Sequence, residues 1–130
     1  MRRRVGARDR GAAAVETALM LPLLLIVLFA IIDFGRMVNW QLKVTEAARE
    51  GARAYSFGET PDGRVSTVMG GLTDVTITPN AGCAGLPAPS ADAVVTVSYQ
   101  FQFITPFAAL AGMVVGPQTL SATGVMPCRG

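Results

Sequence analysis

Glu16 raises the main chemical question in this sequence, because it stands near the start of an otherwise apolar run from Ala12 to Ile32. An unpaired charge at the centre of a bilayer costs at least ~2.5 kcal/mol on insertion scales. The carboxylate can pair with a cation inside an apolar helix bundle, or it can reach back to the cytoplasmic boundary of the membrane and need no partner. The residues alone leave both interpretations open.

The remaining acids and serines do not form the patterns that enzymes use. The 130-residue chain has no histidine and no glycine-rich phosphate loop followed by a lysine, and no serine has an evident base. The acids beyond the membrane exit are predicted to lie on a charged helix face or in turns: Glu46, Glu50, Glu59, Asp62, Asp74 and Asp92. We therefore expect no enzymatic activity and no cofactor.

The two cysteines, Cys83 and Cys128, lie beyond the apolar run. In the absence of histidine, two cysteines do not complete a closed zinc site, so we expect no bound metal. An even number of cysteines in an oxidising compartment favours one disulfide. It would close a loop of about 45 residues and add ~3 to 4 kcal/mol of stability in the chain-entropy model. Two unrelated free thiols are the alternative.

The apolar run is long enough to cross a membrane. Its 21 residues, at a rise of ~1.5 Å each, cover roughly 31 Å, about one hydrocarbon core. Residues 1–11 form a basic leader with five arginines, one acid and a net charge of +4, whereas the rest of the chain carries −2. The positive-inside rule keeps this leader in the cytoplasm and sends the residues after about 33 across the membrane. Binding of nucleic acid is the weaker interpretation, since no aromatic or folded surface accompanies the arginines.

The helix is expected to continue beyond the membrane to about residue 56. Apolar and small residues recur at three- and four-residue steps on one side, and charged residues form the opposite stripe. The first set is Met37, Trp40, Val44, Ala48, Gly51 and Tyr55, and the second is Arg36, Lys43, Glu46, Glu50 and Arg53. We therefore expect one continuous helix over residues 12–56, with a transmembrane part at about 12–33 and an exported amphipathic half at about 34–56. Its small residues predict close packing, and Trp40 suits either a core contact or a membrane anchor.

Residues 57–130 are expected to form a small exported α+β head. The stretch "DGRVSTVMGGL" predicts a short helix from about Pro61 to Met69. Three stretches rich in β-branched residues predict strands: Thr73–Thr78, Ala93–Phe103 and Thr119–Met126. A roughly three-stranded antiparallel sheet has an apolar face that needs cover, and the exported half of the long helix can supply it. The apolar segment "ITPFAALAGMVVGP" suits either a cover of the sheet or a contact with the membrane surface.

The order of basic leader, Gly11, four apolar residues, Glu16 and apolar helix resembles the leader of type IV prepilins. A secretory signal peptide would instead place small residues at the far end of a shorter apolar run. The resemblance implies that a membrane aspartyl peptidase, the prepilin peptidase, cuts after Gly11 and makes Ala12 the new N-terminus. It also implies that Glu16 pairs with the terminal ammonium group of a neighbouring subunit.

The stretch "RGAAAVETALMLPLLLIVLFAIIDFGRMVNWQLKVTEAAREGARAY" is similar to the N-terminal signature of the TadE-like pseudopilins of the tight-adherence (Flp) pilus system. The resemblance covers roughly residues 10–55 and rests on "VETALMLPLLL", on the acid and "FGR" at the membrane exit, and on "AAREGAR". It implies a minor pseudopilin or membrane-anchored assembly component, structural and non-catalytic, in the bacterial inner membrane or associated with the pilus.

The partners that this resemblance implies are the membrane, other pilins or pseudopilins through the N-terminal helix, the prepilin peptidase and the tight-adherence secretion machinery. A signal-anchored exported binding domain unrelated to pili is the alternative function.

Overall fold

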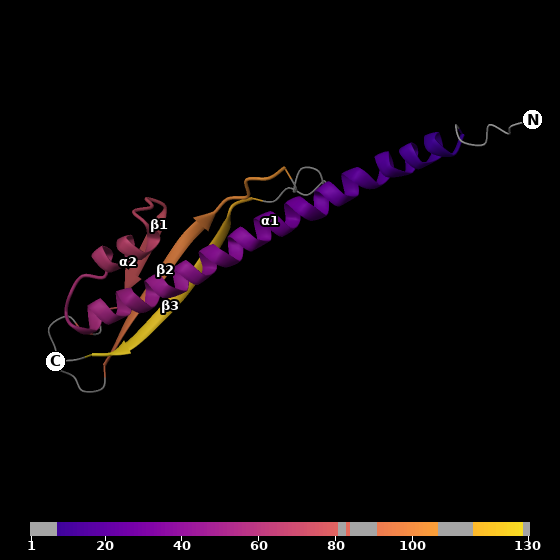
Figure 1. Cartoon of the computed structure of the whole chain (residues 1–130). Helices are drawn as coiled ribbons and strands as arrows, with labels where there is room; N and C mark the ends of the chain where they lie inside the picture. Colours follow the sequence, from indigo (N-terminus) through magenta and orange to yellow (C-terminus); the bar gives the residue numbers. More distant parts are fainter. Residues whose placement is uncertain (1–7, 81–82, 84–90, 107–115, 129–130) are drawn as a thin grey trace, which may run out of the picture. The chain divides into compact units, whose positions relative to one another are not determined.

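The computed structural model describes residues 8–80, 83, 91–106 and 116–128. Within them the chain forms two helices followed by three strands (Figure 1): α1 (Arg8–Ser56), α2 (Asp62–Met69), β1 (Val75–Pro79), β2 (Asp92–Phe101) and β3 (Gln118–Pro127). The predicted α+β class, a long N-terminal apolar helix followed by a three-stranded antiparallel sheet, is confirmed. Most of the predicted leader 1–11, and most of the apolar segment after β2, lie outside the described residues.

The chain divides into two compact units. The first comprises Met1–Phe34 and Ile104–Val115, and the second comprises Gly35–Phe103 and Gly116–Gly130. Helix α1 contributes residues to both units, because its 49 residues pass through position 34 without interruption.

In the first unit, α1 is an apolar helix that runs through Pro22. It begins at Arg8, about one turn before the predicted start at Ala12. Within the part of the chain that the structure describes, α1 is the one helix long and apolar enough to span a membrane, and the most apolar part of it is not buried inside the protein.

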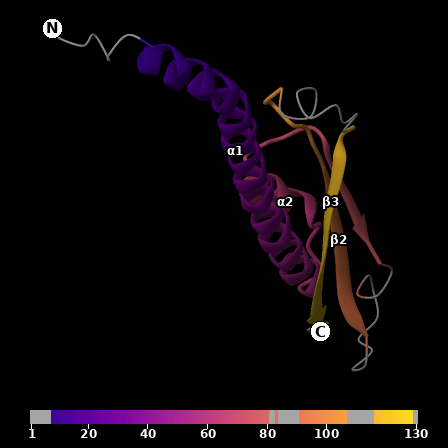
Figure 2. The same cartoon turned by 90° about the vertical axis from the view of Figure 1, so that its right-hand side faces the viewer.

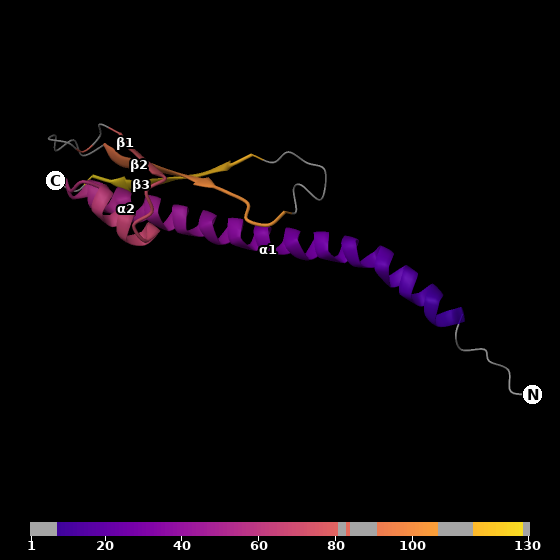
Figure 3. The ribbon, with the colours of Figure 1, turned by 90° about the horizontal axis from the view of Figure 1, so that it is seen from above.

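In the second unit, the sheet has the strand order β1-β2-β3 and both pairings are antiparallel. The second half of α1 and helix α2 lie on the same face of this sheet (Figures 2 and 3). The predicted middle strand extends to Phe103, whereas β2 ends at Phe101. It ends there because Phe101 pairs with Gln118, the first residue of β3.

The core of the second unit fills the space between the two helices and the sheet. Its buried side chains come from α1, α2, β2 and β3: Val44, Ala47, Ala48, Ala52, Val65, Met69, Val95, Val97, Phe101 and Leu120. The helix face that the periodicity predicted is confirmed, since its six residues are either buried or packed against this core. Side chains alternate along β2 between this core and the other face of the sheet, because Val95, Val97 and Phe101 are buried while Gln100 is exposed.

Trp40 is partly buried and packs against this core. Its ring lies 5.0 Å from the ring of Tyr99, measured between centroids, and packs against the buried cluster. The ammonium group of Lys43 lies 4.5 Å from the centroid of the Trp40 ring, and the guanidinium of Arg36 lies 5.5 Å from the centroid of the Phe101 ring. The cations at the start of this amphipathic half therefore lie close enough to aromatic rings for cation–π attraction.

Helix α2 ends where the glycine pair predicted. Gly70 and Gly71 both have positive φ angles, which glycine adopts without steric cost. The N–H of Gly71 donates to the carbonyl of Ser66 at 2.9 Å, and the N–H of Gly70 donates to the carbonyl of Thr67 at 3.3 Å. These bonds satisfy carbonyl groups that the helix end leaves open.

The chain end is tied to the loop after β1. Cys83 and Cys128, which are 45 positions apart in the sequence, form a disulfide with their Cα atoms 5.8 Å apart. Beside it, the N–H of Cys128 donates to the carbonyl of Ala91 at 3.1 Å. The disulfide therefore joins the end of β3 to the connection between β1 and β2.

Candidate functional site

The residues predicted for leader cleavage and assembly lie near the start of α1. Gly11, Ala12 and Glu16 are all helical, and all three residues are exposed on the isolated chain. Glu16 follows Ala12 by four positions, so the two residues lie on one side of the helix with a rise of about 6 Å between them. A second chain can therefore reach both groups from the same side.

Thr17 is the polar neighbour of Glu16, and its hydroxyl is satisfied inside the helix. The Oγ1 atom donates to the carbonyl oxygen of Ala13 at 2.9 Å. This is the local bond by which threonine enters apolar helices. The presence of the Glu16 carboxylate in the apolar run is therefore what remains to be explained.

The surface of α1 in the first unit is apolar on all sides. Large hydrophobic side chains are exposed along it: Val15, Leu19, Met20, Leu21, Leu23, Leu24, Val27, Leu28, Ile31, Ile32 and Phe34. A helix that is apolar all round has to be covered by lipid or by other helices. The described part of this chain does not cover it.

Asp33, directly after the apolar run, is a feature that the periodicity did not predict. Its side chain is only 1% exposed. One carboxylate oxygen accepts the N–H of Ile104 at 3.4 Å, and the other accepts both the N–H of Thr105, at 3.3 Å, and the hydroxyl of Thr105. The partners lie more than 70 residues along the chain, so no local pattern contained them. In the sequence, the feature that could have pointed to Asp33 was its position as an acid directly after an apolar helix segment.

Helix α1 thus carries an exposed glycine and acid at its start, an uncovered apolar surface, a buried acid at the end of that surface and a face of small residues. Residues 11–53 match the family model described as TadE-like protein. The resemblance that the sequence showed is therefore confirmed for this part of the chain. The match relates this segment of α1 to the TadE-like family.

The TadE-like segment covers about a third of the chain and lies wholly within α1. It contains Gly11, Ala12, Glu16 and Asp33, together with the small residues that pack against the sheet. Helix α2 and the three strands lie outside it. Comparisons with curated proteins and with solved structures found no significant match.

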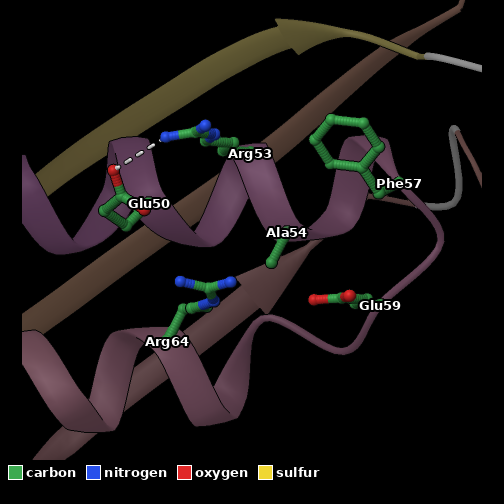
Figure 4. A pocket seen from close by; sticks show the side chains of 6 residues that line it. All are labelled: Glu50, Arg53, Ala54, Phe57, Glu59 and Arg64. Carbon is green, nitrogen blue, oxygen red and sulfur yellow. Dashed lines mark ion pairs between the residues drawn. The ribbon is translucent and has the colours of Figure 1, made fainter.

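A pocket of about 170 Å³ opens between the end of α1 and helix α2 (Figure 4). Its lining is Glu50, Arg53, Ala54, Phe57, Glu59 and Arg64. The carboxylate of Glu50 and the guanidinium of Arg53 form an ion pair at 3.9 Å on the helix surface. The two acids and two arginines balance in charge, and exposed pairs of this kind contribute only ~0.2 to 1 kcal/mol to stability. We assign this pocket no chemical role.

Among the residues that the structure describes, no group of three metal-ligating side chains comes together. The two cysteines are joined to each other and are not available as ligands.

Proposed function

We propose that this protein is a minor pseudopilin, or a membrane-anchored assembly component, of a tight-adherence pilus. The observation that carries the proposal is the TadE-like match over residues 11–53, on a helix whose apolar surface the described chain leaves uncovered. The role is structural. The helix packs against the helices of other pilins or pseudopilins, and residues 57–130 form a head that makes the remaining contacts.

The proposed topology is a single pass through the bacterial inner membrane. Residues 1–11 stay in the cytoplasm, residues 12–33 span the bilayer, and residues 34–56 continue outside it with the head. The five arginines of the leader support this orientation, because positive charge is retained on the cytoplasmic side. The disulfide between Cys83 and Cys128 suits the oxidising side of the membrane.

The proposed maturation step is cleavage between Gly11 and Ala12 by the prepilin peptidase. Cleavage removes the basic leader and creates an ammonium group at Ala12, one turn from the carboxylate of Glu16. Inside an apolar bundle, that carboxylate and the ammonium group of a neighbouring subunit each stabilise the other, whereas either one alone is costly. This pairing explains why an acid stands in the apolar part of the helix.

The experiment is intact mass measurement of the protein extracted from membranes of cells with an active prepilin peptidase. We expect the parent chain to begin at Ala12, and Gly11→Ala to remain at full length while still inserted. Gly35→Ala is the matched control, because Gly35 is a second exposed glycine of α1 with open space around it.

A full-length parent chain in the presence of active peptidase would contradict the maturation step. It would favour the alternative, a signal-anchored exported domain that binds a partner unrelated to pili. Loss of surface pili on deletion of the gene, with restoration by the parent but not by Gly11→Ala, is the functional outcome that the proposal requires.

A further inference from the structure

The carboxylate of Asp33 fixes the start of the segment that follows β2 against helix α1. It accepts hydrogen bonds from the backbone N–H groups of Ile104 and Thr105 and from the Thr105 hydroxyl. All of these residues belong to the first compact unit, together with the apolar part of α1. A carboxylate that is 1% exposed and accepts several donors holds this turn in one position.

The position of Asp33 along α1 sets the depth of that turn in a membrane. Asp33 is the first residue after the apolar run that ends at Ile32, and the 21 residues of the run already match one hydrocarbon core. It therefore lies at the outer boundary of the bilayer when the helix spans it. Atoms within hydrogen-bond distance of its carboxylate lie at nearly the same depth.

Three apolar side chains are exposed at this junction. Ile104 is 72% exposed and Phe34 is 62% exposed, and Pro106 is exposed beside them. Within Ile104–Pro106 the polar side chain is that of Thr105, and its hydroxyl is bonded to Asp33. The backbone N–H groups of Ile104 and Thr105 and the Thr105 hydroxyl thus point to the Asp33 carboxylate, and the side chains of Ile104 and Pro106 are left exposed on the surface.

We propose that Ile104–Pro106 is a second membrane-contacting element, which places the Ile104 side chain in the interfacial region of the bilayer at the outer end of the span. The occupant of this surface is lipid, because the turn is held at the outer end of the apolar helix surface that spans the bilayer in the proposed topology. The inference rests on the membrane-spanning part of the proposed function. In this arrangement Asp33 is a positioning residue that couples the strand connection to the membrane surface.

The test uses single-tryptophan variants of the full chain in vesicles of phosphatidylcholine whose acyl chains are brominated either near the headgroup or near the bilayer centre. The background is Trp40→Phe, which removes the native tryptophan and keeps an aromatic ring against Tyr99. Ile104→Trp probes the turn, and Leu24→Trp probes the middle of the span, where the native residue is 66% exposed. Val125→Trp is the matched control, an apolar residue that is 55% exposed on the sheet face opposite the helices.

Ile104→Trp is expected to lose emission with bromine near the headgroup and to lose less with bromine near the bilayer centre. Leu24→Trp is expected to show the opposite order, and Val125→Trp to lose emission with neither lipid. An Ile104→Trp probe as insensitive as Val125→Trp, beside a quenched Leu24→Trp, would overturn the second contact and leave the span intact. A Leu24→Trp probe that no brominated lipid quenches would overturn the span, and the second contact with it.

A further pair of variants tests the positioning role of Asp33. In the Ile104→Trp background, Asp33→Ala removes the acceptors of the turn, and the headgroup-region quenching is expected to fall. Asp74→Ala removes an exposed acid from the turn before β1 and is expected to leave the quenching unchanged. Equal quenching in both variants would show that the turn reaches the lipid without the carboxylate, and the positioning role would be withdrawn.

Discussion

Gly124 of β3 lies directly against the backbone of Ala48 in α1. A Cβ atom built on Gly124 would collide with the carbonyl group of Ala48 and would lie 2.9 Å from the backbone nitrogen of Arg49. Both obstacles are main-chain atoms of a helix, so neither can turn aside as a side chain does. The approach of strand to helix in the second unit therefore depends on a glycine on one side and an alanine on the other.

Gly124→Ala is expected to destabilise the fold by about 2 to 3 kcal/mol, at the upper end of the range for overpacking, because the helix has to move. The measurement is denaturant unfolding of the full chain in detergent, followed by near-ultraviolet circular dichroism of Trp40, whose ring packs on Tyr99. Gly63→Ala is the control, since Gly63 is in α2 with open space around its Cα. It is expected to be neutral or to stabilise by up to ~1 kcal/mol. Equal midpoints for the two variants would contradict the backbone contact.

Gly51→Ala is expected to cost less than Gly124→Ala, about 1 kcal/mol. Its new Cβ atom would lie 2.9 Å from Cγ2 of Val65 and 3.2 Å from Cγ1 of Val95, and these are side-chain atoms that can shift. Alanine also favours the helical backbone by ~0.5 to 1 kcal/mol relative to glycine, which offsets part of the clash. The same unfolding measurement checks the order, and a larger loss for Gly51→Ala than for Gly124→Ala would show that the valines cannot yield.

Reduction of the disulfide is expected to lower the stability of the second unit by about 4 kcal/mol, the chain-entropy value for a loop of 45 residues. Peptide mapping without reduction should recover Cys83 linked to Cys128 after export. The double variant Cys83→Ser with Cys128→Ser should unfold at the same denaturant concentration with and without reductant, which separates loss of the bond from other effects of the reductant. Free thiols at both positions in the exported protein would contradict the pairing.

Glu16→Ala is expected to separate assembly from insertion. Removal of a carboxylate from an apolar segment eases insertion by up to ~2.5 kcal/mol, so the variant should still enter the membrane. An ammonium group left unpaired at the neighbouring Ala12 costs on the order of 3 kcal/mol, which weakens association more than a hundredfold. The measurement is crosslinking of the protein to itself and to other pilins in membranes, with a count of surface fibres at matched expression.

Glu46→Ala is the control for this prediction, because Glu46 is an exposed acid in the amphipathic half of the same helix. It should crosslink and support fibres as the parent does. Normal crosslinking and fibre numbers in Glu16→Ala would remove the pairing role and favour a carboxylate that reaches the membrane boundary alone.

The sequence by itself determined the local elements of this protein. The apolar run from Ala12 to Ile32, the alternation along β2 and the glycine pair after Met69 each specify structure through neighbours a few residues away. Helix and strand periods, and the conformational freedom of glycine, act over that range. The resemblance of residues 11–53 to the TadE-like family could also be recognised from local sequence, because the matched residues follow one another on a single helix.

Only the tertiary structure decided which distant residues meet. The amphipathic pattern allowed Trp40 to anchor in a membrane or contact a core, and the sheet that brings Tyr99 beside it packs Trp40 against the core. In the sequence, Asp33 is only an acid at the end of an apolar helix segment. The fold places Thr105 within hydrogen-bond distance of it. Gly124 had no evident role until β3 was laid against Ala48. These contacts depend on close packing between segments far apart in the chain, and the period of a local pattern carries no information about the partner that will cover it.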